Sequence, residues 1–204
     1  MTTSTDTTVG LLQAVLDDLA RVVEAVKPGQ LHHPTPCTDW DVARLGDHIV
    51  GWLSTFAGGF ADPDGQAPRA SLDGYEPPAD RAAEVRAATR TLTGAIRVGA
   101  AARPLRLGTS AMPGEMALNM ILWEYLMHGW DLARATGQEW RPSARAAEES
   151  LSFAPAMLTE DYQGEGKPFG KPVPVPANAP PLDRLLGLSG RDPGWRPADP
   201  LQRG

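Results

Sequence analysis

Apolar residues recur along most of the chain at intervals of three and four positions, the spacing of amphipathic helices. Connections rich in proline and glycine separate these patterns, and no stretch alternates with period two for long enough to predict a sheet. Only Leu105 to Leu107 could form a short extended piece. The fold class that we predict is therefore all-α. The expected helices run from Val9 to Val26, Thr38 to Phe56, Ala79 to Val98, Glu115 to Gly137, Pro142 to Ala154 and Leu182 to Leu188.

The helix from Glu115 to Gly137 is expected at the centre of the protein, because residues 120–130 are almost entirely apolar. Glu124 and His128 interrupt this run four positions apart, so they lie on one face of the helix, one turn from each other. A buried carboxylate needs a partner. A divalent metal would satisfy both side chains, and a hydrogen bond between carboxylate and imidazole would do so without a metal.

A second imidazole, His48, falls beside the apolar stripe of the helix that Thr38 is expected to cap. A lone histidine in such a place is commonly a core residue that is hydrogen-bonded to a neighbour. With Glu124 and His128, however, it gives three candidate metal ligands on two helices, and helical bundles hold metals between facing helices. Two imidazoles and one carboxylate suit zinc and leave a coordination position open, and nickel, manganese or iron could use the same ligands.

Three residues near these ligands are candidates for supporting roles. Asp131 could orient a ligand imidazole, or it could be a carboxylate on the helix surface, and the sequence does not separate the two. Trp52 and Trp123 could line a pocket beside the metal, although core packing is the default for aromatic residues on buried helices.

Other residues with reactive or ligating side chains have simpler interpretations. Cys37 lies just before the second helix, but no base is close to it in the sequence, and we interpret it as a packing residue. His32 and His33 stand side by side in a loop and are expected to be solvated. The connection from Gly58 to Pro78 is long for a structureless loop, and it could form part of a pocket mouth.

Composition argues against several classes of function. The chain has 204 residues, with 19 Lys and Arg against 25 Asp and Glu, and no basic run of the kind that binds nucleic acid or anionic lipid. It has no apolar stretch long enough to span a membrane and no secretory signal, and its single cysteine allows no internal disulfide. We expect a cytoplasmic protein with a helical bundle over residues 1–160 and a Pro- and Gly-rich tail over residues 161–204 that packs on it.

Three blocks of the sequence resemble a known superfamily: PTPCTDWDVARLGDHIVG at 34–51, EYLMHGWDLARATG at 124–137 and FGKPVPVPANAPPLDRLLGLSGRDP at 169–193. The chain is similar to DinB-like metal-binding proteins, in particular to an actinobacterial branch related to the N-terminal domain of mycothiol-dependent maleylpyruvate isomerase. The resemblance implies an antiparallel four-helix bundle and a divalent metal, zinc above all, held by His48, Glu124 and His128.

The resemblance also implies a chemistry. Related branches use a low-molecular-weight thiol such as mycothiol. We therefore expect a metal-dependent S-transferase or thiol-dependent isomerase that acts on a small electrophilic metabolite. A homodimer is plausible for this superfamily. The chain leaves no room for the isomerase's additional C-terminal domain, so maleylpyruvate is not the expected substrate. Two alternatives stay open: a thiol-independent lyase, cyclase or hydrolase that tailors a secondary metabolite, and a bundle that binds metal without catalysis. A fourth protein ligand, such as His32 or His33, would indicate the last of these.

Overall fold

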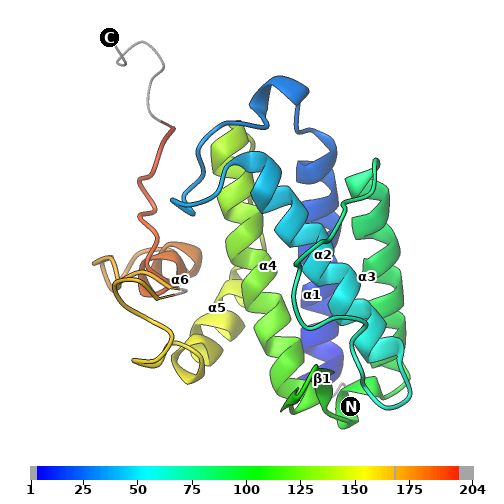
Figure 1. Ribbon diagram of the computed structural model, residues 1–204. Coiled ribbons are helices and arrows are strands. Elements are labelled where there is room, and N and C mark those ends of the chain that lie inside the picture. Colours follow the sequence, from blue (N-terminus) through cyan, green and yellow to red (C-terminus); the bar gives the residue numbers. More distant parts are fainter. Residues whose placement is uncertain (1–3, 168, 198–204) are drawn as a thin grey trace.

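The computed structural model describes residues 4–167 and 169–197 and shows a mostly helical protein (Figure 1). Four long helices form a bundle, two shorter helices flank it, and a small antiparallel hairpin precedes the fourth helix. The all-α prediction is confirmed. Within the described residues, no helix combines the length and the apolar character needed to cross a membrane. The elements are α1 (Ser4–Glu24), α2 (Val42–Ala61), α3 (Arg81–Arg97), β1 (Leu105–Leu107), β2 (Ser110–Met112), α4 (Gly114–Thr136), α5 (Ala144–Phe153) and α6 (Pro181–Leu188), with short 3₁₀ turns at Pro28–Gln30, Ala100–Ala102 and Ala154–Ala156.

α1 is antiparallel to α3, and α2 is antiparallel to α4. The long connection between α2 and α3 makes this arrangement possible. α3 runs antiparallel to α1, since Arg86 near the start of α3 pairs with Glu24 at the end of α1 (2.6 Å). α3 runs in the same direction as α2, since Arg81 at the first position of α3 pairs with Asp47 near the start of α2 (2.6 Å). The connection 62–80 therefore returns along the length of α2. α4 starts beside the start of α1, so these two helices run in the same direction. Since α2 runs opposite to α1, α2 and α4 are antiparallel.

The apolar core extends from the bundle to the C-terminal helix. α4 is buried on most sides, as its apolar run predicts, and Trp123 and Tyr125 are among its fully buried side chains. α1 and α2 pack on α4, α5 packs on another side of it, and α6 packs on α5 (Figure 1). Leu185 and Leu186 of α6 are fully buried and belong to the same core. α6 thus shares the core of the bundle, and the division of the chain at residue 160 stays a prediction.

Asp41, and not Thr38, caps α2: its Oδ1 accepts the backbone N–H of Arg44 at 2.9 Å. The expected cap was wrong because Thr35 holds the residues before Asp41 in a loop. The hydroxyl of Thr35 donates to the carbonyl oxygen of Trp40 at 2.8 Å. Residues 36–40 are therefore a loop beside α2 instead of its first turn, and this loop forms part of the site described below.

The connection between α2 and α3, which from the sequence could have formed part of a pocket mouth, does not line the pocket of the candidate site described below. Its residues 65–67 run beside β1, where the N–H of Ala67 donates to the carbonyl oxygen of Arg106 at 2.9 Å. This backbone pairing holds the connection at the end of the bundle where α4 begins (Figure 1).

Candidate metal centre

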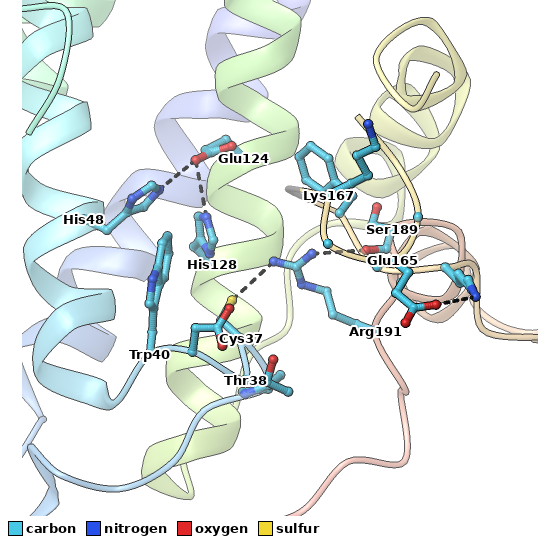
Figure 2. A pocket seen from close by; sticks show the side chains of 18 residues that line it. Cys37, Thr38, Trp40, His48, Glu124, His128, Glu165, Lys167, Ser189 and Arg191 are labelled. Carbon is cyan, nitrogen blue, oxygen red and sulfur yellow. Dashed lines mark hydrogen bonds and ion pairs between the residues drawn. The ribbon is translucent and has the colours of Figure 1, made fainter. Parts of the chain in front are cut away.

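His48, Glu124 and His128 converge between α2 and α4 (Figure 2). The Nε2 atoms of both histidines lie near the same oxygen, Glu124 Oε1, at 3.1 Å for His48 and 3.3 Å for His128. One donor atom of each residue lies within 4.8 Å of the other two. Next to this group, Tyr125 donates its hydroxyl to the carbonyl oxygen of Ile49 at 3.3 Å, which fixes the register of the two helices. The structure thus brings together the three candidate ligands.

The three side chains are shielded from water, and their charges depend on one another. The side chains of His48 and Glu124 are 20% and 21% exposed, and that of His128 is 9% exposed. Burial lowers the pKa of His48 despite its hydrogen bond to Glu124. Burial also opposes the ionisation of Glu124 and His128, but their mutual attraction outweighs it, with hydrogen bonds from His48 to Glu124 and from His128 to Asp131 adding to the effect. The pKa of Glu124 is therefore held well below, and that of His128 well above, its ordinary value. In the absence of a metal, these shifts favour the ionised form of Glu124 and the protonated form of His128, and they disfavour protonation of His48.

Asp131 lies behind His128 and not on the helix surface. Its side chain is fully buried (0% exposed), and its Oδ2 lies 3.1 Å from Nδ1 of His128. Arg191 donates from Nε to Oδ1 at 3.1 Å and from Nη2 to Oδ2 at 2.9 Å. Burial raises the pKa of Asp131, but Arg191 and His128 outweigh it and lower this pKa to about 2. With a carboxylate on Nδ1, His128 is oriented as metal-ligating histidines are, with Nε2 directed at the other ligands.

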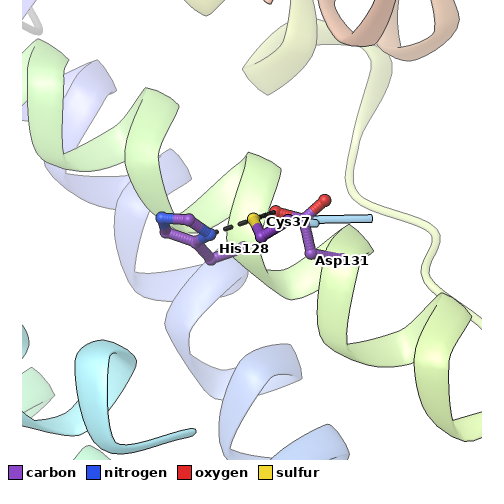
Figure 3. A group of neighbouring side chains, drawn as sticks. All are labelled: Cys37, His128 and Asp131. Carbon is purple, nitrogen blue, oxygen red and sulfur yellow. Dashed lines mark hydrogen bonds and ion pairs between the residues drawn. The ribbon is translucent and has the colours of Figure 1, made fainter. Parts of the chain in front are cut away.

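A second group of donor atoms, Cys37 with His128 and Asp131, also lies within 4.8 Å (Figure 3). The thiol of Cys37 donates to Asp131 Oδ2 at 3.2 Å, and Nη2 of Arg191 lies 3.5 Å from its sulfur. The guanidinium of Arg191 already supplies a positive charge here, and it would repel a cation bound to this group. Electrostatics therefore favours the first group, His48 with Glu124 and His128, as the metal site.

The first group opens into a pocket of about 1010 Å³. One wall comes from the loop before α2, where the ring of Trp40 lies with its centroid 4.4 Å from that of His48. The opposite wall comes from the tail, in residues 164–167, 169–171 and 189–191 (Figure 2). Cys37, interpreted from the sequence as a packing residue, is half-buried and lines the first wall, while its thiol contacts Asp131 and Arg191.

The structure places the other candidate residues outside this lining. Trp52 packs its edge against His48 (6.5 Å between centroids) and stacks on Phe56, while Trp123 is fully buried and donates its indole N–H to Ser189 at 3.2 Å. Both aromatic rings thus serve the packing that was their default interpretation. His32 and His33 are exposed, as expected, and do not line the pocket.

Two residues at the site were not singled out from the sequence, namely Trp40 and Arg191. Trp40 lies in a loop, where a side chain's direction has no periodic signal. Arg191 lies 60 residues after Asp131, so only the folded tail brings the two together. The one signal in the sequence was that both residues fall in blocks that carry the family resemblance.

Fold and site together define a class of protein: a helical bundle with a buried His/Glu/His group that opens into a large pocket. Residues 12–133 match the family model of the mycothiol maleylpyruvate isomerase N-terminal domain, and the chain belongs to this family, which is DinB-like, metal-binding and related to mycothiol. Two uncharacterized proteins from two Mycobacterium tuberculosis strains are each 31% identical over 186 residues, which cover 88% of this chain and 94% of theirs. No solved structure gives a significant match.

Proposed function

We propose that this protein is a divalent-metal-dependent enzyme that uses a low-molecular-weight thiol of the mycothiol type, either to transfer the thiol to a small electrophilic metabolite or to isomerise that metabolite. The observation that carries the proposal is the convergence of His48, Glu124 and His128 at the base of a pocket. The family supports the thiol, because its model is described by a mycothiol-dependent reaction.

The donor set fits a divalent metal. Two imidazole nitrogens and a carboxylate oxygen are the ligands of catalytic zinc sites, and nickel, manganese and iron accept the same donors. Three protein ligands would leave a coordination position open, and all three residues line the pocket. When bound there, the metal would act as a Lewis acid and would lower the pKa of a coordinated thiol. Asp131 keeps the Nδ1 side of His128 occupied, so that Nε2 is the nitrogen left for the metal.

The pocket walls fit two reactants. A volume of about 1010 Å³ is at the upper end of the range of roughly 300–1,000 Å³ for small-molecule sites. Trp40 and Phe169 supply apolar surface on opposite walls, and Lys167 places an ammonium group on the tail side (Figure 2).

The first experiment measures metal content after incubation with zinc, nickel or manganese and removal of free ion. We expect about one ion per chain in the wild type and little in His48→Ala or His128→Ala. The matched control is His33→Ala, which removes an exposed imidazole from outside the pocket. A wild type that stays metal-free with all three ions refutes the proposal.

The second experiment tests the thiol. The metal-loaded protein is mixed with mycothiol and other low-molecular-weight thiols and with a panel of electrophiles. Loss of free thiol detects transfer, conversion of the electrophile detects isomerisation, and both are compared with the His128→Ala variant. Turnover that needs both metal and thiol supports the proposal. Turnover of the same compounds without thiol would instead indicate a thiol-independent lyase, cyclase or hydrolase. A loaded protein that is inert with every thiol would leave metal binding as its property and remove thiol chemistry.

A further inference from the structure

The C-terminal tail places a buried arginine, Arg191, beside Asp131, behind the candidate metal ligands. Arg191 follows α6, and its side chain is only 10% exposed. Its backbone N–H donates to the carbonyl oxygen of Leu186 at 2.9 Å, and its Nη1 donates to that of Ser189 at 3.2 Å. Both the backbone and the guanidinium of Arg191 are therefore fixed within the tail before they meet the bundle.

Arg191 is also the charge that balances Asp131. A fully buried carboxylate without a charged partner would be strongly unfavourable, and the planar guanidinium meets both carboxylate oxygens as a fork. The carboxylate in turn lies against Nδ1 of His128. The contacts run without a gap from the tail through Arg191 and Asp131 to His128 and Glu124.

We propose that Arg191 is a positioning residue of the metal centre: it fixes the carboxylate of Asp131, and through it the imidazole of His128, so that residues outside the matched family region complete the site. This inference rests on the proposed function, because it assumes that His128 is a ligand. Arg191 lies beyond residues 12–133, to which the family model extends, whereas Asp131 and the three candidate ligands lie within them.

The expected effect follows from how such partners act in known metal sites. Loss of a group that orients a ligand histidine lowers metal affinity by about 10- to 100-fold. We therefore expect Arg191→Ala to raise the zinc dissociation constant by a factor in this range, measured by competition with a chromophoric chelator. Arg191→Lys keeps the charge but lacks the fork, so its dissociation constant should lie between those of Arg191→Ala and the wild type. The matched control is Arg184→Ala, which removes an exposed arginine from the same tail.

Two readouts separate positioning from a merely structural role of Arg191. First, added guanidinium ion, kept well below denaturing concentration, should restore part of the affinity of Arg191→Ala, because it can occupy the place beside Asp131 without linking the tail to the bundle. Second, the losses of zinc affinity caused by Arg191→Ala and Asp131→Asn should not be additive. If Arg191 acts through Asp131, the double variant binds zinc about as weakly as Asp131→Asn alone.

The outcomes distinguish the failure of this inference from that of the proposed function. A wild type that binds no metal overturns both. A wild type that binds zinc through His48 and His128, together with an Arg191→Ala variant that binds it equally tightly, overturns the role of Arg191 alone. Additive losses in the double variant, or an absence of guanidinium rescue in a folded Arg191→Ala protein, do the same. If Arg191→Ala does not fold, wild-type affinity in Arg191→Lys overturns the requirement for the fork.

Discussion

Replacing Asp131 by asparagine tests the electrostatics of the site in the metal-free protein. Asp131→Asn keeps the size of the side chain and removes its charge. In the wild type this carboxylate is fully buried and accepts bonds from Arg191, His128 and Cys37. The variant leaves the guanidinium of Arg191, itself 10% exposed, without its counter-ion. We therefore expect the folded state to lose stability even though no volume is lost.

The loss of unfolding free energy in Asp131→Asn can be estimated in two ways. Removing one partner of a buried ion pair typically costs about 3–5 kcal/mol, because the other charge stays buried and unpaired. Independently, folding lowers the pKa of Asp131 from 3.8 to about 2, and each pKa unit corresponds to about 1.4 kcal/mol, so ionisation of this group favours the folded state by about 2.5 kcal/mol. The second value is the smaller because protonation leaves a carboxylic acid that can still donate and accept hydrogen bonds.

The sign of the pH dependence follows from the lowered pKa. The stabilising contribution of Asp131 is fully present above pH 3.8, the ordinary pKa of the unfolded group, and is lost as the pH falls toward 2. About 1 kcal/mol of it should be gone at pH 3.

The assay is urea denaturation in the presence of a chelator, between pH 7 and pH 3. The difference in unfolding free energy between wild type and Asp131→Asn should be largest near neutral pH and should shrink as the pH falls toward 3. Asp17→Asn, which removes an exposed carboxylate on α1, is the matched control and should change stability by less than about 0.5 kcal/mol. A loss below 1 kcal/mol for Asp131→Asn at pH 7 would refute the argument that Arg191 depends on this carboxylate.

Two further predictions concern packing and metal binding. A Cβ at Gly129 on α4 would lie 2.2 Å from the ring of Trp140, so Gly129→Ala should lose about 1–3 kcal/mol, whereas Gly94→Ala on the exposed side of α3 meets no atom within 4 Å and should gain about 0.5–1 kcal/mol. Thermal unfolding checks both, and shifts in the same direction would contradict the packing argument. In the metal-free protein the pKa of His128 is above its ordinary value, so zinc must displace a proton at pH 7 and apparent affinity should rise with pH. Calorimetry in two buffers of different ionisation enthalpy measures the protons released, and an affinity that is constant from pH 6 to pH 8 would contradict this.

Most of the fold could be predicted from the sequence, because apolar periodicity is a local property and the core imposes it on every long helix. α3 was expected from Ala79 to Val98 and runs over Arg81–Arg97, and Gly137 ends α4 with φ +70° as a C′ glycine. The start of α2 was misplaced, since both Thr38 and Asp41 are good caps and a hydrogen bond from Thr35 decides between them. The N-cap preferences of Thr and Asp alone do not decide between these two positions.

In the candidate site, too, residues related by helix periodicity could be predicted, whereas contacts that depend on the tertiary fold could not. Glu124 and His128 could be placed together because four positions make one turn of a helix, and His48 could be added because it lies beside an apolar stripe. The alternatives for Asp131 could not be separated until its burial was known. Arg191 was beyond prediction, because its contact with Asp131 spans 60 residues and depends on the path of a proline-rich segment without periodicity.

The candidate ligands and the pocket wall opposite them come from different parts of the chain. The candidate ligands and Asp131 all lie within residues 12–133, the part of the chain that the family model matches. The pocket wall opposite them comes from residues 164–167, 169–171 and 189–191, beyond the family model. Groups that would meet a substrate on that side, among them Lys167, are therefore specific to chains that share this tail. The two mycobacterial relatives cover 88% of the chain, more than the family model does. Substrate choice should accordingly follow the tail, whereas the candidate metal ligands come from the bundle and depend on the tail only through Arg191.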